Sequence, residues 1–216
     1  MSRDSALDAL VLRTPRLELR PVGEGDLREL LATANAGVHP PAEMPFAVPW
    51  TDTLGTPEGD ASFLDFHRVA RASIGPDDWR LMMCVRADGA AAGVQGIEAE
   101  RLAETRAVST GSWLGVAHQR RGLGTEMRAA VLELAFAVLG AERATSGAID
   151  GNIASRRVSE KLGYREVGRS TVAPRGVDVG HADLELTRAE WQASRTIPVE
   201  VQGADAGLLE LLGAQM

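Results

Sequence analysis

The segment HQRRGLGTEMRAAVLELAF, residues 118 to 136, joins a loop rich in glycine and arginine to a regular apolar repeat. The apolar positions recur at the spacing of one helix face, at Met127, Ala130, Val131, Leu134, Ala135 and Val138. This spacing predicts a helix that begins near Gly122 or Leu123, so the loop supplies its first turn.

The start of this predicted helix has the physical properties of an anion site. The first four peptide N–H groups of a helix have no partner inside it, and the aligned peptide dipoles add about half a positive charge there. Gly122 and Gly124 lack a Cβ atom, so a ligand can approach their backbone closely. Phosphate or pyrophosphate is the natural occupant. The plainer alternative is a glycine-bearing turn in front of a core helix.

Two familiar phosphate motifs do not fit the loop. Met127 stands where the dinucleotide fingerprint G-x-G-x-x-G needs its third glycine. The P-loop needs a lysine directly after its glycines, and none follows here. A nucleotide or phosphosugar bound at the same helix start stays open as an alternative.

Composition narrows the class of protein. The net charge of −7 and the pI of about 5.2 argue against a nucleic-acid binder. No apolar run approaches the roughly 18 residues that span a bilayer, and residues 1 to 14 do not resemble a signal peptide. Cys84 is the only cysteine, and the four histidines lack metal-ligand spacing. We therefore expect a cytoplasmic protein with no metal, no membrane partner and no nucleic-acid partner.

The order of predicted elements indicates an α/β chain with a sheet of mixed direction. Residues 39 to 50 hold four prolines and are expected to be irregular. Helices are predicted over residues 24 to 36, 61 to 73 and 152 to 162, the last ended by Gly163. Strands are predicted over residues 16 to 20, 80 to 87, 91 to 98, 107 to 116, 143 to 149, 164 to 171 and 181 to 186.

Four motifs in register resemble the GNAT acyltransferases. Residues 119 to 124, QRRGLG, match the Q/R-x-x-G-x-G/A motif of that family. Asn152-Ile153-Ala154-Ser155 and the later EKLGY, residues 160 to 164, resemble the second half of its acyl-CoA site. TPRLELRP (residues 14 to 21) and LTRAEW (residues 186 to 191) resemble the two ends of the RimJ/RimL-like branch. The sequence is thereby identified as a member of this family.

The resemblance implies the GNAT fold, a mixed central sheet splayed at the acyl-CoA site and flanked by helices on both faces. It implies residues 1 to 192 as the acyltransferase domain and residues 193 to 216 as an extension, packed on the domain or in an interface. The strand over residues 112 to 116 is expected to carry a bulge and to pair with pantetheine. The acyl-CoA contacts that it implies are Leu114, Val116, Gln119, Arg120, Arg121, Gly122, Leu123, Gly124, Thr125, Asn152, Ser155 and Arg157.

The same resemblance implies direct attack of a primary amine on a thioester in a ternary complex. Ser155 is implied to contact the cofactor or to protonate the departing thiolate, with a hydrogen bond at the helix start as the alternative. Ser159 stands where many members have a tyrosine acid, so a water or the thiolate's own departure is the alternative to an acid from the chain, and Tyr164 is expected to pack in the core. An α-amine with a pKa near 7.8 costs about 1 kcal/mol to deprotonate at pH 7, so it needs only a modest base. Glu98 is the candidate base, with Glu100 beside it; a solvated edge carboxylate is the alternative.

The acceptor is expected to be an amine of a small molecule or of a protein N-terminus. In the family, the region of residues 39 to 50 lines the acceptor pocket, here through Met44, Phe46 and Trp50; a loop packed on the core is the alternative. The co-substrate is expected to be acetyl-CoA, with succinyl-CoA or another larger acyl-CoA as the alternative. A homodimer is implied by the family. A non-catalytic CoA-binding sensor is the alternative from another functional class.

Overall fold

The centre of the sheet is a hairpin whose two strands are buried on both faces. The computed structural model describes residues 3–214. In it β3 (Asp78–Ala87) and β4 (Ala90–Glu100) are joined through a turn at Asp88-Gly89, a dipeptide typical of hairpins. Seven consecutive residues of β4, from Ala91 to Ile97, are buried, and this pattern is typical of a central strand covered by helices on both sides.

The described residues form one mixed sheet of nine strands in the order β7-β8-β6-β5-β4-β3-β2-β1-β9. Neighbouring strands are antiparallel except for β5 and β6, which are parallel. The remaining strands are β1 (Val11–Arg13), β2 (Leu17–Pro21), β5 (Ala107–Leu114), β6 (Arg143–Ile149), β7 (Arg165–Val172), β8 (Val179–Thr187) and β9 (Glu200–Gln202).

The parallel pair β5 and β6 separates halfway along its length. Its pairing runs from Ala107–Arg143 to Thr110–Ser146 and ends there. Beyond that point β5 stays paired with β4 as far as Leu114, while β6 stays paired with β8 as far as Ile149. The sheet therefore has a V-shaped opening between residues 111–114 and 147–149, which we call the split.

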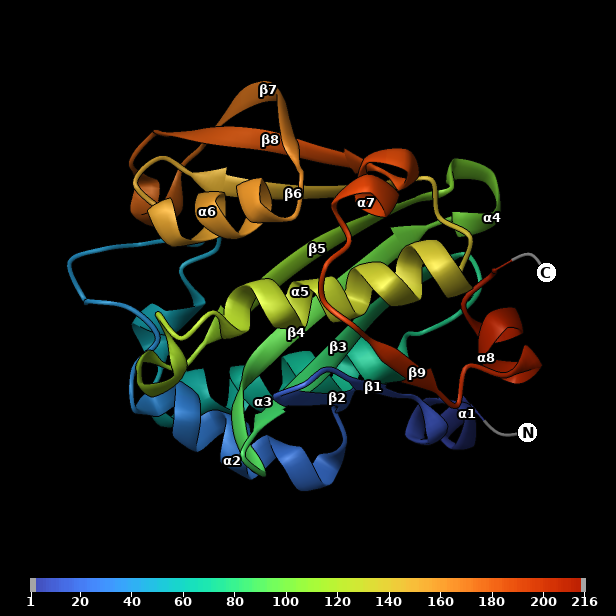
Figure 1. Cartoon of the computed structure of the whole chain (residues 1–216). Coiled ribbons are helices and arrows are strands. Elements are labelled where there is room, and N and C mark those ends of the chain that lie inside the picture. The colour runs from blue at the N-terminus through green and yellow to red at the C-terminus, as the bar shows by residue number, and fades with distance from the viewer. Residues whose placement is uncertain (1–2, 215–216) are drawn as a thin grey trace.

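Helices cover both faces of the sheet (Figure 1). On one face α5 (Leu123–Glu133) crosses the sheet and continues into a π-helical turn, with α6 (Ile153–Lys161) and α7 (Arg188–Ser194) beside it. On the other face lie α2 (Glu24–Asn35) and α3 (Pro57–Ala72). The shorter helices are α1 (Arg3–Ala9), α4 (Leu102–Thr105), α8 (Ala206–Leu211) and the 3-10 turns η1 (Trp50–Thr53), η2 (Val116–His118) and η4 (Pro174–Gly176).

Each face of the sheet has its own apolar core. The larger core lies under α5 and includes Phe136 and Trp191, whose rings are 5.2 Å apart. The smaller core lies under α2 and α3 and includes Leu30, Phe63 and Cys84. Burial raises the pKa of the Cys84 thiol to about 12, so this thiol is a packing group.

The C-terminal segment closes the edge of the sheet. β9 pairs with β1 in antiparallel register, and Leu208 and Leu212 beyond it have no exposed surface. The indole of Trp79 donates to the carbonyl oxygen of Leu212 at 2.9 Å. Figure 1 shows this end of the chain beside α1, so both described ends lie on the same side of the molecule.

The predicted elements from residue 16 to residue 186 are confirmed with small changes at their ends. One predicted strand is too long, because β5 ends at Leu114 and the backbone turns into η2, whose first residue is Val116. The expected bulge in this strand is wrong: pairing with β4 runs without a shift from Ser109–Glu98 to Leu114–Gly93. The split arises instead because β6 follows β8 after Ser146. No described helix is long and apolar enough to cross a membrane.

Candidate active site

The loop before α5 presents a row of free peptide N–H groups. Arg120 and Gly122 both adopt left-handed φ angles, of 60° and 81°, and Gly122 is the N-cap of α5. The N–H groups from Arg120 to Gly124 donate to no acceptor among residues 3–214, whereas that of Thr125 reaches the Gly122 carbonyl at 3.2 Å. The anion site expected from the sequence therefore has its physical basis in these N–H groups.

Two of the expected acyl-CoA contacts fix the loop in place. The amide nitrogen of Gln119 donates to the carbonyl oxygens of Leu114, at 2.7 Å, and Val38, at 2.6 Å. The N–H of Val116 donates to Gly37 at 2.9 Å, and its side chain is exposed. These bonds connect the end of β5 to the loop after α2. The edge of β5 from Gly111 to Leu114, which faces the split, does not pair with β6.

Basic side chains surround the free N–H groups. Arg120 and Arg157 are exposed, and within the described residues neither guanidinium meets a carboxylate. Arg121 is also exposed and lies 3.8 Å from Asp88. The loop itself is braced by Arg16, which donates to the Arg121 carbonyl at 2.8 Å and pairs with the buried Glu126. Exposed cations around free amides favour a polyphosphate.

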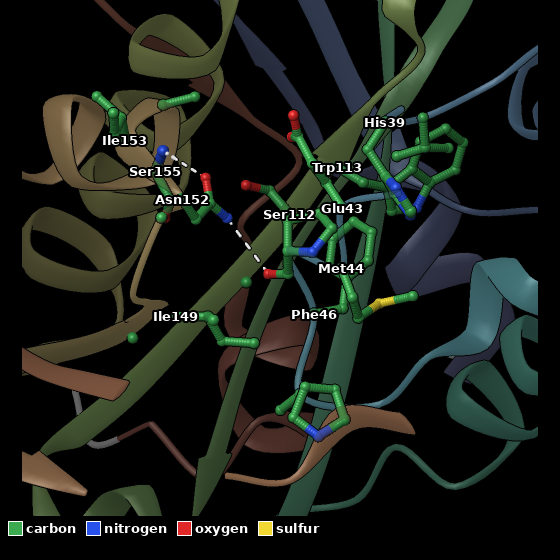
Figure 2. Close-up of a pocket in the computed structure, with 18 of the residues that line it drawn as sticks. His39, Glu43, Met44, Phe46, Ser112, Trp113, Ile149, Asn152, Ile153 and Ser155 are labelled. Carbon is green, nitrogen blue, oxygen red and sulfur yellow. Dashed lines mark hydrogen bonds between the residues drawn. The ribbon is translucent and has the colours of Figure 1, made fainter. Parts of the chain in front are cut away.

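Asn152 connects the second helix of the site with the loop opposite. Its Oδ1 accepts from the Ser155 N–H at 3.0 Å, so it is the N-cap of α6. Its Nδ2 donates to the Pro45 carbonyl at 3.3 Å, a contact that Figure 2 shows reaching from α6 to the loop after α2. Ser155 and Gly124 both line the pocket between α5 and α6, and a Cβ on Gly124 would lie 3.3 Å from Val158.

A pocket of about 790 Å³ connects part of this loop, Gln119 and Gly124, with Asn152 and Ser155 at the start of α6. It begins between Gly124 of α5 and Ser155 of α6, passes residues of both strands at the split, and continues to the proline-rich loop. Met44 and Phe46 of that loop line it, together with Trp113 of β5. Trp50 lies behind this wall, with its ring 5.2 Å from Phe46 and 5.6 Å from Trp113. Figure 2 shows the α6 residues on one side of the pocket and the aromatic residues on the other.

Glu98 lies outside this pocket. Its carboxylate pairs with Arg80 at 2.6 Å and accepts from the Ser109 hydroxyl at 2.9 Å. It is therefore held by its neighbours on β3 and β5, and it is absent from the residues that line the pocket. Glu100 is exposed at the end of β4. The structure thus does not bring the candidate base Glu98 together with Ser155.

A buried arginine faces the pocket from α5. Arg128 is 3% exposed and donates to the Ser159 hydroxyl at 2.9 Å and to the Ser112 hydroxyl at 3.4 Å. Its Nε is buried without an acceptor, and none of the carboxylates of residues 3–214 pairs with it. Burial lowers the pKa of its guanidinium, which nevertheless stays charged at neutral pH. Tyr164 is buried nearby, as expected, with its hydroxyl 3.3 Å from Thr110.

The far wall contains groups that the sequence did not single out. His181 of β8 and Arg175 of η4 line the pocket beside the proline-rich loop. Arg175 pairs with Asp52 and donates to the Pro41 carbonyl at 3.3 Å, so η4 is tied to the loop after α2. These residues come from segments more than 100 positions apart in sequence, and no local motif marks them.

Comparison with known proteins agrees with this geometry. The GNAT acetyltransferase domain model matches residues 16–165. The chain is similar in fold to Mycobacterium smegmatis RimJ in complex with CoA-disulfide, with a TM-score of 0.69 and 20% identity over 89% of this chain and 97% of that one. It is also similar to a GCN5-related N-acetyltransferase from Brucella melitensis, with a TM-score of 0.65 and 22% identity over 86% and 81% of the two chains.

A GNAT-family acetyltransferase from Bacillus anthracis has the same fold, with a TM-score of 0.63 and 14% identity over 83% of this chain and 99% of that one. The family match covers more than half of the chain. The protein therefore belongs to the GNAT acetyltransferase family, and it is an N-acetyltransferase. The family resemblance and the mixed, split sheet predicted from the sequence are confirmed.

Proposed function

We propose that the protein transfers an acetyl group from acetyl-CoA to the primary amine of a small molecule or of a protein N-terminus. The observation that carries this proposal is the pocket of about 790 Å³, which runs from Gly124, the last residue in the row of free N–H groups, through the split to an aromatic wall. A polyphosphate and an amine placed at its two ends would meet where β5 and β6 part. Such an arrangement suits direct attack in a ternary complex.

The acyl-CoA half of the proposal rests on three features of this chain. The free N–H groups from Arg120 to Gly124 suit the pyrophosphate, with Arg120, Arg121 and Arg157 adding charge. The unpaired edge of β5 after Thr110 suits the amides of the pantetheine arm by strand addition. Ser155, which lines the pocket at the start of α6, is the proposed proton donor to the departing thiolate.

A turnover measurement tests the proposal directly. CoA release from acetyl-CoA is followed with a panel of α-amino dipeptide amides and small primary amines, and CoA binding is measured in parallel by calorimetry. We expect CoA release that depends on the amine. Tight CoA binding without release on any amine would contradict the proposal and favour a CoA sensor, and binding of ATP without binding of CoA would overturn the acyl-CoA site.

A second donor is favoured by one specific observation: the guanidinium of Arg128 has no carboxylate partner among the described residues. A buried charge without a counter-ion is costly, often by several kcal/mol. Its Nε lacks any acceptor among the described residues, and the side chain lines the pocket beside Ser112 at the split. An acyl group that ends in a carboxylate, such as succinyl, would supply the missing acceptor. Succinyl-CoA is therefore the second candidate donor.

The two donors are separated by kcat/KM for acetyl-CoA and succinyl-CoA in the wild type and in Arg128→Gln. If succinyl-CoA is the donor, the wild type prefers it and the variant loses about 100-fold with succinyl-CoA alone, as expected for a buried charged hydrogen bond worth roughly 3 kcal/mol. If acetyl-CoA is the donor, the wild type prefers acetyl-CoA and the variant loses activity equally with both. The melting temperature of Arg128→Gln serves as the folding control.

We further propose that residues 193–216 fold as one unit with residues 1–192, that the protein works in the cytoplasm, and that it forms a homodimer. The first of these is supported by the described part of the extension, where Leu208 and Leu212 are buried and β9 pairs with β1. Residues 215 and 216 lie outside the described residues. Size-exclusion chromatography with light scattering tests the dimer.

A further inference from the structure

A histidine and an aspartate of β8 form a hydrogen-bonded pair at the far wall of the pocket. Nδ1 of His181 lies 3.0 Å from Oδ1 of Asp183 and 3.3 Å from the hydroxyl of Ser170 on β7. The Ser170 hydroxyl donates to the same carboxylate oxygen at 3.0 Å. Because a carboxylate only accepts, the neutral ring carries its proton on Nδ1 and leaves the lone pair of Nε2 free.

The ring of His181 is directed to the split. A Cβ built on Gly147 would lie 2.2 Å from both Cε1 and Nε2 of this ring, so the imidazole occupies the space that a side chain at residue 147 would take. Gly147 directly follows Ser146, the last residue of β6 that pairs with β5. His181 and Gly147 also line the same pocket. The free nitrogen therefore lies beside the point where the two strands part.

The two sides of the split carry different chemistry. Ser112 lies on the α5 side, where Arg128 reaches it, and Ser155 lines the pocket from α6. His181 lies opposite Ile149 in the register of β6 and β8, on the sheet face that has Glu98 and Trp113 rather than α5. A thioester held between α5 and α6 and an amine on the aromatic side would thus have the imidazole on the side of the amine.

We propose that Nε2 of His181 accepts the proton of the attacking amine and that Asp183 positions the ring. This inference rests on the proposed function of the pocket. The amine nitrogen forms a bond to the thioester carbonyl carbon and passes one proton to Nε2. The carbon–sulfur bond breaks, the thiolate leaves and takes up a proton, and Nε2 returns its own proton to solvent. An ordinary imidazole, with a pKa near 6.5, is matched to an α-amine with a pKa near 7.8.

Several charged groups surround the imidazole. Asp183 lies on β8 itself, and Asp150, at the end of β6, pairs with Arg169 of β7 close to Gly180. Four further charged or titratable side chains line the same pocket: Glu43 and His39 of the proline-rich loop, Arg175 of η4 and Arg128 of α5. Both signs of charge are present, so the pair with Asp183 is the specific contact that fixes the ring.

The pH dependence of kcat/KM for the amine tests the proposal, with acetyl-CoA as donor and the dipeptide amide that the wild type uses best. In the wild type we expect activity to fall as the pH drops through the range where an imidazole gains a proton. His181→Gln is expected to lose about 100-fold at pH 7, the lower end of general-base contributions, and to lose this acidic limb. Asp183→Asn is expected to lower kcat with the KM for acetyl-CoA unchanged.

Two comparison variants keep the test specific. Glu185→Gln removes a carboxylate two residues after Asp183 on the same face of β8 and outside the pocket lining. Its kcat/KM for the amine is expected to stay within about threefold of the wild-type value. Glu98→Gln tests the rival base. An acidic limb that survives in His181→Gln and disappears in Glu98→Gln overturns the proposal, and so does His181→Gln with wild-type activity.

The ring protonation is measured without turnover by ¹⁵N NMR of the imidazole. We expect the neutral ring of His181 to carry its proton on Nδ1 in the wild type and to lose this preference in Asp183→Asn. A proton on Nε2 would overturn the proposal. A wild-type enzyme that binds CoA but releases none with any amine would overturn the proposed function, whatever the protonation of the ring.

Discussion

The two halves of the sheet differ in how completely their strands pair. From β9 to β4 each strand is joined to its neighbours, and the leucines of the C-terminal segment seal the edge. Between β5 and β6 pairing stops at Thr110 and Ser146. One of the four buried side-chain atoms without a partner among the described residues is Nε of Arg128, whose side chain lines the pocket at the split. The paired half supplies stability, and the open half leaves polar groups available to ligands.

The largest effect that we expect is on the paired half. Leu208 has no exposed surface and packs in the core beside α1, so Leu208→Ala should lower the free energy of unfolding by about 3 kcal/mol through lost burial and the resulting cavity. Chemical denaturation measures this change. Activity per folded molecule should be unchanged, and Glu210→Ala, an exposed change on the same helix, should cost less than about 0.5 kcal/mol.

A loss of catalytic activity in Leu208→Ala larger than its unfolded fraction would contradict this distinction between the halves. It would mean that the C-terminal segment at the paired edge affects catalysis at the split as well as stability.

The next effect belongs to the open half. A Cβ on Gly124 would already lie 3.3 Å from Val158, so Gly124→Val should push α6 aside and narrow the cleft that Ser155 lines. We expect CoA affinity to fall about 100-fold, or roughly 2.7 kcal/mol, while the protein stays folded. Calorimetry with CoA measures this loss. Ala129→Val adds a branched side chain to the same helix outside the pocket lining and serves as the control. Unchanged affinity in Gly124→Val would remove the cleft from the site.

The smallest effect is expected at the outer rim. The guanidinium of Arg175 donates to Asp52 and holds the pKa of that carboxyl below its ordinary value of 3.8. A lowered carboxyl pKa means that the pair persists above the ordinary pKa and is lost only as the pH falls through the lowered value. Arg175→Ala should raise the KM for the amine by less than about fivefold, as expected of an exposed pair.

The matched control for Arg175→Ala is Arg156→Ala. Arg156 pairs with Glu166 at 2.8 Å with nearly the same exposure, and it lies outside the pocket lining. Equal changes in KM for the two variants would show that the contact between η4 and the proline-rich loop has no specific role at the acceptor end.

The parts of the structure also differ in how well the sequence predicts them. The α5 start and α6 are local features, and their signals lie within a few residues: Gly122 and Gly124 before an apolar stripe, Asn152 before a short helix. These features, the succession of strands and helices along the chain, and the family were predicted. The short α1 and β1 were missed, because their burial depends on partners such as β9, about 190 residues away.

The residues of the far wall of the pocket could not be predicted from the sequence for a related reason. His181 and Arg175 become recognisable as site residues only when β8 and η4 meet around the split. Glu98 was predicted as the base from the alternation of residues along β4, and this alternation gives the sheet face of Glu98 correctly. It does not reveal that the Glu98 carboxylate already pairs with Arg80 and accepts from the Ser109 hydroxyl. Side-chain partners across strands depend on register, and register comes from the folded sheet.

The most direct test of the central claim is the crystal structure of the protein with CoA. We predict that the pyrophosphate accepts from the peptide N–H groups between Arg120 and Gly124, and that the thiol lies in the split between residues 111–114 and 147–149. A complex with CoA bound elsewhere would contradict the account, and so would a complex in which β5 and β6 remain hydrogen-bonded to each other beyond Thr110 and Ser146.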